Sequence, residues 1–225
     1  MSNNTFQAID NHIAELFQLN DDAVQAADAN SEAAGLTWLR ISPVQGKFLN
    51  VMASACRAQR ILEIGTCAGY SGIWLARALP ENGRLITLEL EPEYAALARK
   101  NFELAGLTSR VEVRVGDALE SLKAMVEASE APFDMVFIDA DKPPYPEYLK
   151  WALKLSKSGT FIVADNVIRY ARINEEVQEG DELLDRTLAI RQFAQDVASN
   201  EGLNATFLQM VGEKEADGMA LMVVQ

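Results

Sequence analysis

From residue 60 onward, short runs of apolar residues alternate along the chain with longer segments that mix apolar and polar positions. The short runs have the length and near-continuous apolar character of buried strands, and the longer segments resemble amphipathic helices. Strands separated by helices are typical of βαβ units, so we expect an α/β fold with a mainly parallel sheet. The predicted strands are 60–64, 84–89, 111–115, 133–138 and 160–164, and the predicted helices are 71–79, 92–105, 118–128 and 145–156.

The chain before residue 60 is predicted to be helical. Apolar residues between Phe6 and Phe17 recur at helical spacing, which indicates an amphipathic helix whose apolar stripe must pack on some surface. Ser42, Pro43 and Gln45 are typical of a helix start, because Ser caps the first turn, Pro suits the first helical position and Gln completes a capping box. We therefore expect helices ahead of the alternating pattern.

The C-terminal part of the chain departs from the strand–helix alternation. A polar stretch from 167 to 182 is expected to be a surface loop, and the next segment, 184–197, is expected to be a helix. The apolar runs 205–211 and 218–224 are separated by a short turn-prone segment, so these two strands can pair only antiparallel. The sheet is therefore predicted to end in an antiparallel hairpin.

The composition is that of a soluble globular domain with an acidic surface. Of the 225 residues, 49% are hydrophobic, 33 are acidic and 20 are basic, which gives a net charge of −13. This charge repels phosphate backbones and anionic membranes, so we expect neither a nucleic acid nor a membrane as a partner. No linker or repeat divides the chain, and we expect one domain, residues 36–225, preceded by a helical extension, residues 1–35.

The basic residues and the cysteines bear on the cellular compartment. No Lys or Arg precedes Arg40, so we expect no targeting segment at the N-terminus. Cys56 and Cys67 form neither a disulfide framework nor a zinc-ligand pattern, and each is expected to be a small buried hydrophobe. Both observations favour the cytoplasm.

Glycines gather where the first predicted strand meets the following helix. Gly65, Gly69 and Gly72 lie at the edge of the sheet where open α/β folds bind their ligands, but their spacing is not that of the dinucleotide fingerprint. Glu89 ends the second strand, where a carboxylate can hold the hydroxyls of a ribose. Asp117, after the third strand, either lines the same cleft near an adenine ring or only caps the next helix.

Carboxylates and an amide follow the fourth and fifth predicted strands. Asp139 and Asp141 come after the fourth strand, and Asp165 and Asn166 close the fifth. Because neighbouring parallel strands end at one edge of a sheet, these side chains can converge, and their hard oxygen atoms suit Mg²⁺ or Ca²⁺ better than zinc. The alternative is purely structural, with Asp139 paired to Lys142 and Asp165 capping a turn.

Four motifs of the chain occur together in one enzyme family. They are E-I-G-x-x-x-G-Y-S from residue 63, F-I-D-A-D-K-x-x-Y from residue 137, D-N at 165–166 and S-x-x-Q-G-x-F-L from residue 42. In this combination they resemble the cation-dependent O-methyltransferases of the caffeoyl-CoA and catechol type, especially the bacterial branch. The resemblance covers roughly residues 36–225 and implies the class I methyltransferase fold, a mostly parallel sheet with an antiparallel last strand. It also implies S-adenosylmethionine as the cofactor and a homodimer.

The resemblance implies roles for single residues as well. Lys142 matches the catalytic base, and Asp139, Asp165 and Asn166 match the ligands of a divalent cation, with Mg²⁺ expected first and Ca²⁺ or Mn²⁺ as alternatives. Tyr170 stands where the plant caffeoyl-CoA enzymes carry an Asn that contacts the substrate, so we expect it at the acceptor. The positions expected to meet or support the cofactor are Ile41, Glu63, Gly65, Thr66, Ser71, Glu89, Asp117, Ala118 and Asp141.

The predicted function is the transfer of a methyl group from S-adenosylmethionine to a hydroxyl of a catechol-like small molecule or its ester. Vicinal hydroxyls can chelate a cation, which lowers the pKa of the reacting hydroxyl, and Lys142 could then take the proton. Two alternatives stay open. One is a phosphatase of the haloacid-dehalogenase type, with Asp139 as nucleophile and Asp141 as acid or base, and the other is a cofactor-binding protein without catalysis.

Overall fold

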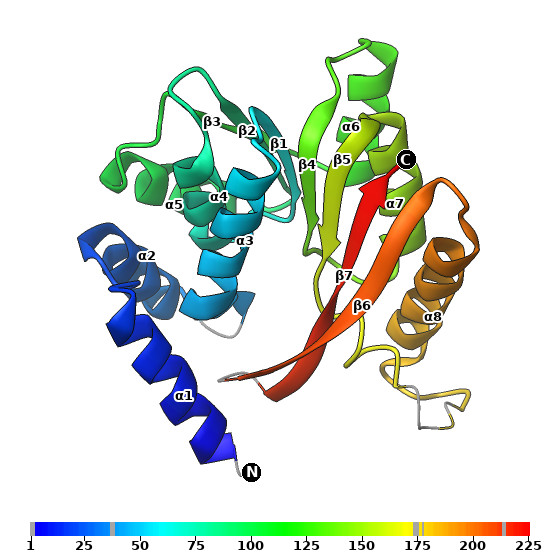
Figure 1. Cartoon of the computed structure of the whole chain (residues 1–225), viewed down its shortest axis with the longest axis horizontal. Helices are drawn as coiled ribbons and strands as arrows, with labels where there is room; N and C mark the ends of the chain where they lie inside the picture. The colour runs from blue at the N-terminus through cyan, green and yellow to red at the C-terminus, as the bar shows by residue number, and fades with distance from the viewer. Residues whose placement is uncertain (1–2, 37–38, 173–175, 177, 213–214) are drawn as a thin grey trace.

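The computed structural model describes residues 3–36, 39–172, 176, 178–212 and 215–225, and their strands form one twisted sheet between layers of helices (Figure 1). The strands are β1 (Arg60–Ile64), β2 (Arg84–Glu89), β3 (Val111–Val115), β4 (Phe133–Ile138), β5 (Ser156–Ala164), β6 (Leu203–Gly212) and β7 (Glu215–Val224). The helices are α1 (Asn3–Leu16), α2 (Asp22–Ala33), α3 (Pro43–Ala55), α4 (Tyr70–Ala78), α5 (Pro92–Leu104), α6 (Ala118–Glu127), α7 (Tyr145–Lys154) and α8 (Leu184–Ser199).

The order of the strands places β1 and β4 side by side at the centre of the sheet. Across the described strands the order is β3-β2-β1-β4-β5-β7-β6, in which β1 to β5 pair in parallel. β7 pairs antiparallel with both β5 and β6. The chain therefore builds outward from β1 in one direction and from β4 in the other, and ligands of open α/β sheets bind at such a switch point. The predicted α/β fold with an antiparallel end is confirmed.

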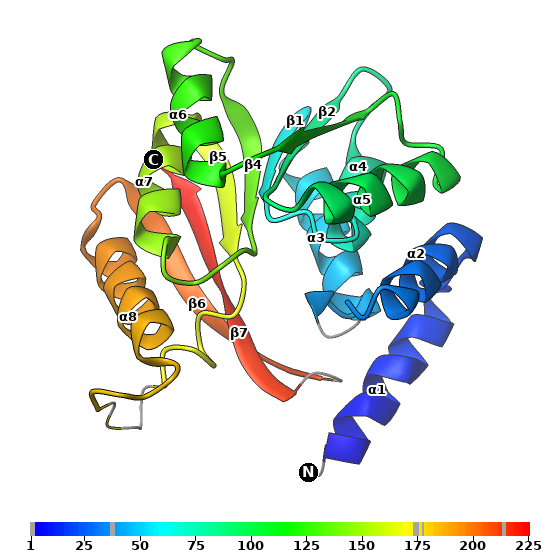
Figure 2. The same ribbon diagram turned by 180° about the vertical axis from the view of Figure 1, so that it is seen from behind.

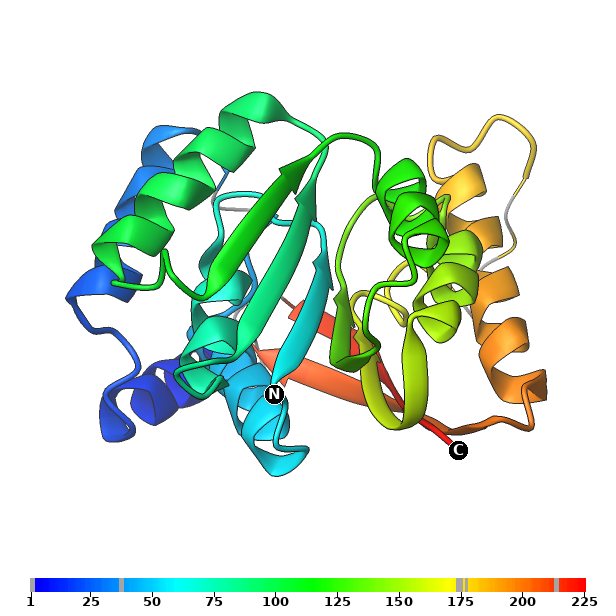
Figure 3. The ribbon, with the colours of Figure 1, turned by 90° about the horizontal axis from the view of Figure 1, so that it is seen from above.

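Alternating residues of the central strands face two separate hydrophobic cores. Ile61 and Phe137 pack with residues of α3, α4 and α5, whereas Leu62 and Ile138 pack with residues of α6, α7 and α8. Successive side chains of a strand point to opposite faces, so continuous apolar runs indicate a sheet buried on both sides. Figure 3 shows the two groups of helices on either side of the sheet.

The fifth strand starts earlier than the apolar pattern predicts. The predicted start at Thr160 and the predicted helix end at Ser156 are wrong, because β5 already begins at Ser156, which pairs with Phe133. The backbone N–H of Phe133 also donates to the carbonyl of Leu155 at 2.9 Å. The first residues of β5 are polar and largely exposed, so they lack the apolar signal that marks a buried strand.

The N-terminal extension contains two helices rather than the one that the sequence predicts. Val24 and Ala27 of α2 belong to the hydrophobic core beneath α3 to α5. The predicted amphipathic helix α1 is present, but its side chains Ile9 and Leu16 are 45% and 64% exposed, and the following Phe17 is 63% exposed. Figures 1 and 2 show α1 extending away from the sheet. Part of its apolar stripe is therefore not covered by the described part of the chain.

The predicted start of α3 is confirmed, whereas the predicted bounds of the C-terminal hairpin are too narrow. Ser42 caps α3, and a full capping box forms between Ser42 and Gln45. The strands of the C-terminal hairpin extend further than predicted, up to Gly212 and from Glu215. Residues 173–175 and 177 of the predicted surface loop and residues 213–214 of the turn lie outside the described residues. Among the helices that are described, none is long and apolar enough to span a membrane.

Candidate active site

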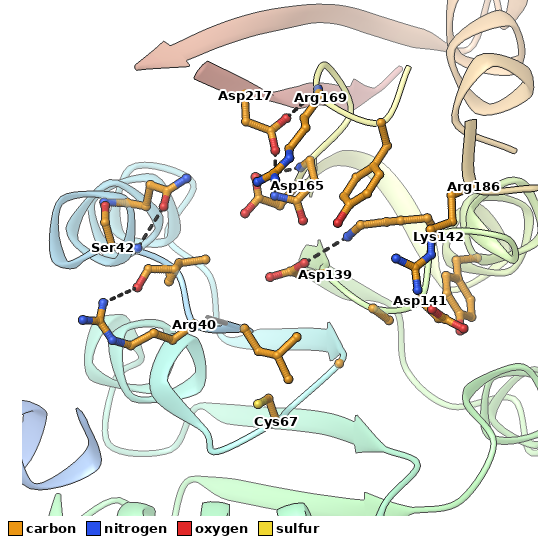
Figure 4. A pocket seen from close by; sticks show the side chains of 18 of the residues that line it. Arg40, Ser42, Cys67, Asp139, Asp141, Lys142, Asp165, Arg169, Arg186 and Asp217 are labelled. Atoms are coloured by element: carbon orange, nitrogen blue, oxygen red, sulfur yellow. Dashed lines mark hydrogen bonds and ion pairs between the residues drawn. The ribbon is translucent and has the colours of Figure 1, made fainter. Parts of the chain in front are cut away.

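A cavity of about 750 Å³ runs along the ends of the central strands (Figure 4). Its two sides differ in composition. We call the wall that follows β1, β2 and β3 the glycine side, and the wall that follows β4 and β5 the aspartate side. The glycine side includes Gly65, Cys67, Leu88, Glu89, Asp117 and Ala118. The aspartate side includes Asp139, Asp141, Lys142, Asp165, Asn166, Tyr170 and Asp217.

The backbone after β1 makes a turn that requires glycine. Gly65 has φ +100°, and a Cβ at this position would collide with the carbonyl of Asp139 at the end of the neighbouring strand. Gly69 has φ +80° and begins α4, and its N–H donates to the carbonyl of Thr66 at 2.8 Å. Glycine adopts such backbone angles without a steric penalty. The turn can therefore lie close to β4 and leave space for a ligand.

A buried carboxylate supports this turn from below. Glu63 is fully buried and accepts hydrogen bonds from Ser71 at 2.6 Å and Thr87 at 2.7 Å. The hydroxyls of Thr87 and Thr66 lie 2.5 Å apart. Burial raises the pKa of Glu63 to about 7, although its two hydroxyl partners favour the charged form. Thr66 and Ser71 line a small cavity next to the large one, whereas Glu63 lines neither and supports the turn through its neighbours.

Glu89, at the end of β2, lies on the glycine side of the cavity. Its carboxylate accepts hydrogen bonds from the backbone N–H of Cys67 at 2.6 Å and of Glu91 at 2.9 Å. Burial and this neighbouring carboxylate raise the pKa of the Cys67 thiol to about 11. The thiol therefore stays protonated, and Glu89 is held in one orientation at the position that the sequence predicts.

Asp117 both caps a helix and lines the cavity, and its predicted place near an adenine ring stays a prediction. Its side chain caps α6 by accepting a hydrogen bond from the N–H of Glu120 at 3.0 Å, and the residue also lines the cavity. Ala118, Ile41 and Asp141 line the same cavity. The predicted cofactor positions are thus brought to one cavity or to the turn beside it.

On the aspartate side, a buried lysine lies between an acid and a phenol. The Lys142 nitrogen is 3.2 Å from Oδ1 of Asp139 (Figure 4). It is also 2.6 Å from the hydroxyl of Tyr145. Lys142 is 6% exposed and Tyr145 is fully buried. The nitrogen also lies 5.8 Å from the ring centre of Tyr170, so that residue borders the same group. The predicted base is therefore held in place at the cavity wall.

Asp165 lies next to Asp139 at the end of β5. Burial, followed by the charge of Asp139, raises the pKa of Asp165 to about 8, and Lys142 opposes this shift. Its Oδ1 accepts a hydrogen bond from the backbone N–H of Asn166 at 2.8 Å. The structure therefore contains the contacts of the structural alternative, which are a capped turn at Asp165 and an ion pair of Asp139 with Lys142. These side chains still line the cavity.

The sequence analysis missed Asp217. Its Oδ2 accepts a hydrogen bond from the side-chain amide of Asn166 at 3.0 Å, and its Oδ1 accepts one from the backbone N–H of Arg169 at 2.9 Å. Asp217 precedes Gly218 in an acidic segment just before the last apolar run, and nothing in this segment distinguishes Asp217 from its acidic neighbours. It fixes the amide of Asn166 beside Asp165.

The oxygen atoms of the aspartate side fit a hard divalent cation. Asp139 and Asp165 bring two carboxylates together in a largely buried place, and Lys142 supplies one positive charge. The raised pKa of Asp165 reflects its burial first and the negative charge of Asp139 second. Asn166 adds an amide oxygen, and carboxylate and amide oxygens are the ligands of Mg²⁺ and Ca²⁺. Among the described residues, no group of three or more His, Cys, Asp and Glu side chains could hold a metal ion. The predicted ligand set contains only two residues of these types, Asp139 and Asp165, because its third ligand is the amide of Asn166.

A comparison with protein families identifies the class of enzyme. Residues 18–223 match the sequence model of the O-methyltransferase family. The chain belongs to the O-methyltransferase family. The match begins at residue 18, within the N-terminal extension. The resemblance based on the sequence motifs covers a shorter range, which begins at about residue 36. The prediction of an S-adenosylmethionine-dependent O-methyltransferase is confirmed, and the phosphatase alternative finds no support in this match.

Curated relatives of this O-methyltransferase have similar lengths. A catechol O-methyltransferase from Niastella koreensis is 51% identical over 225 residues, which cover 100% of both chains. A catechol O-methyltransferase from Mycobacterium tuberculosis is 45% identical over 206 residues, 92% of this chain and 90% of the relative.

Solved structures share the fold. An O-methyltransferase from Bacillus cereus, in complex with SAH, has a TM-score of 0.93 and 41% identity, with 100% of each chain covered. The O-methyltransferase TomG from Streptomyces achromogenes, in complex with SAM, has a TM-score of 0.93 and 39% identity over 100% of this chain and 99% of TomG. The predicted class I methyltransferase fold is confirmed.

Proposed function

We propose that this enzyme transfers a methyl group from S-adenosylmethionine to one hydroxyl of a catechol-like acceptor and depends on a divalent cation, Mg²⁺ in the first place. The observation that carries the proposal is the meeting of Asp139, Lys142, Asp165 and Asn166 on one wall of the cavity that also reaches Gly65. The names of two relatives, catechol O-methyltransferases at 51% and 45% identity, support the choice of acceptor.

The aspartate side would hold the cation and the reacting hydroxyl. Asp139, Asp165 and Asn166 are the proposed ligands, and a bound cation supplies positive charge that lowers the pKa of an acceptor hydroxyl. Lys142 is the proposed base. Its nitrogen lies 3.2 Å from Asp139 on the cavity wall, so a hydroxyl placed beside Asp139 is within reach of a proton transfer.

The glycine side would hold the methyl donor. Gly65, Thr66 and Ser71 are proposed to lie at its methionine part, Glu89 at its ribose and Ala118 at its adenine. Because both sides belong to one cavity, the acceptor oxygen can approach the methyl carbon directly. The carbon–oxygen bond forms as the carbon–sulfur bond breaks, and the hydroxyl proton passes to Lys142.

The remaining lining suits an aromatic ring. Leu39, Val44, Met210 and Val211 add apolar side chains to the cavity, and Tyr170 adds a ring beside Lys142. Apolar walls with a few polar groups at one end are typical of sites for small aromatic molecules. A catechol could therefore direct its vicinal hydroxyls to Asp139 and its ring to the apolar walls.

The proposal is tested by methyl transfer from labelled S-adenosylmethionine with and without metal. We expect catechol to be methylated in Mg²⁺, activity to disappear in EDTA, and excess Mg²⁺ to restore it. Resorcinol, whose hydroxyls are not vicinal, is the matched control acceptor and should react poorly, because it cannot chelate. Equal turnover in EDTA would remove the cation from the proposal, and equal rates for resorcinol would remove the vicinal acceptor.

We further propose a homodimer in the cytoplasm. The exposed apolar side chains Ile9, Leu16 and Phe17 at α1 give a second copy a surface to bury, and the two free cysteines Cys56 and Cys67 suit a reducing compartment. Sedimentation velocity should give the mass of a dimer for the full chain. A monomer at micromolar concentration would contradict the dimer.

A further inference from the structure

Tyr145 is a fully buried residue on the aspartate side to which no role has been given so far. It begins α7, and its hydroxyl lies beneath the ends of β4 and β5. The hydroxyl oxygen is 3.0 Å from the carbonyl oxygen of Asp165, 3.3 Å from that of Ile138 and 2.6 Å from the nitrogen of Lys142. One phenol therefore contacts both strand ends and the proposed base.

The types of these partners decide the direction of each hydrogen bond. A phenol has one proton to donate, and its oxygen can also accept. The carbonyls of Asp165 and Ile138 can only accept, so the phenol proton points to one of them. The oxygen then faces Lys142 as an acceptor, and Lys142 must be the donor in the contact of 2.6 Å.

This direction constrains the lysine nitrogen. Asp139 Oδ1, at 3.2 Å, is a second neighbour that accepts. Besides its bond to carbon, the lysine nitrogen has three bonding directions, and when two of them are N–H bonds that point to acceptors, the third must point away from these acceptors. Lys142 itself lines the cavity, so the remaining direction can face the acceptor hydroxyl.

The ring of Tyr145 cannot easily move its hydroxyl out of this position. Phe193 packs against it edge-on, with ring centres 5.6 Å apart, and Tyr148 lies at 6.2 Å. The Lys142 nitrogen also lies 4.6 Å from the centre of the Tyr145 ring. Close packing in a core holds a side chain in one rotamer. The phenol is thus a fixed reference point for the lysine.

We propose that Tyr145 is a positioning residue that holds the Lys142 nitrogen as a hydrogen-bond donor and thereby directs the remaining side of that nitrogen to the acceptor hydroxyl. The inference rests on the proposed function, in which Lys142 is the base. Tyr145 acts through Lys142 and touches neither the acceptor nor the methyl donor.

The test is the variant Tyr145→Phe, which keeps the ring and removes the hydroxyl. With catechol and Mg²⁺, we expect kcat to fall about tenfold or more, because a general base contributes ~10²- to 10⁴-fold and requires correct placement. KM for catechol, from steady-state kinetics, and Kd for S-adenosylmethionine, from calorimetry, should each change less than about twofold. The reason is that the Tyr145 hydroxyl is expected to stabilise only the transition state. Retained cofactor binding also shows that the variant is folded.

The matched control is Ile190→Val, an apolar change in the same hydrophobic core as Tyr145. It should lower the melting temperature, since Ile→Val in a core costs ~0.5–1.5 kcal/mol, and leave kcat within about twofold. The proposal is overturned if Tyr145→Phe keeps its kcat, raises only KM, loses cofactor binding or loses kcat no more than Ile190→Val does. If Lys142→Ala also keeps full activity, the failure lies in the proposed base itself.

Discussion

The charged side chains on the glycine side and on the aspartate side of the cavity have different kinds of partners. On the glycine side, Glu89 is already paired with uncharged donors, because it accepts two backbone N–H groups. Beneath this wall, the buried Glu63 accepts hydrogen bonds from the hydroxyls of Ser71 and Thr87. On the aspartate side, Asp139 and Asp165 lie close together with Lys142. The first arrangement has stable polar partners, whereas the second keeps charges of both signs in contact.

This difference matches two different tasks. A methyl donor must be held in one place, and groups whose hydrogen bonds are satisfied by the backbone or by buried hydroxyls provide a rigid surface. Proton transfer instead needs groups that can change their charge or accept a cation at a defined position. We therefore expect changes on the aspartate side to act on kcat, and changes on the glycine side to act on stability and cofactor binding.

The largest expected effect comes from Lys142→Ala. Removing the proposed base should lower kcat by ~10²- to 10⁴-fold, the usual contribution of a general base. The glycine side is untouched, so the Kd for S-adenosylmethionine should stay within about twofold. Steady-state kinetics with catechol and calorimetry with the cofactor measure the two quantities separately.

Lys150→Ala provides the matched control for this variant. Lys150 lies on α7, the helix that follows Lys142 along the chain, but it is exposed and paired with Glu147, so its removal should change neither quantity. If Lys142→Ala weakened cofactor binding as much as it lowered kcat, the two sides of the cavity would not be separable.

The fold could be predicted well because it rests on local patterns. The strands β1 to β4 begin and end at the predicted residues, since continuous apolar runs on a doubly covered sheet are bounded by polar or turn-forming residues. The start of β5 could not be predicted in this way, because Ser156 joins the sheet through backbone pairing with Phe133 and carries no apolar signal.

The site was predictable only where its residues form contiguous motifs. Asp139 and Lys142 share one segment, and Asp165 and Asn166 share another, so their types and order could be recognised. Asp217 is 51 residues from Asn166 along the chain, and the antiparallel pairing of β5 with β7 brings the two together. Contacts that depend on register across a sheet leave no signal in a single sequence.

A smaller and different effect is expected from Glu63→Gln on the glycine side. Burial raises the pKa of Glu63 from 4.5 to about 7 in the folded protein. Between these values the folded state holds a proton that the unfolded state has released, so the free energy of unfolding falls as the pH rises through this window. A pKa difference of one unit corresponds to ~1.4 kcal/mol, so the total loss should be about 3 to 4 kcal/mol at most.

The comparison of wild type with Glu63→Gln isolates this group. Urea unfolding of the metal-free proteins at pH 5 and pH 8 should show that wild type loses about 2–3 kcal/mol more than the variant does. Asp165, whose pKa is raised to about 8, contributes the same sign in both proteins and cancels in the difference. Glu103→Gln, an exposed position on α5, should leave the pH dependence of wild type unchanged. If the free energy of unfolding changed equally with pH in wild type and in Glu63→Gln, ionisation of this buried carboxylate would not lower stability. The expected difference between the two sides of the cavity would then be absent.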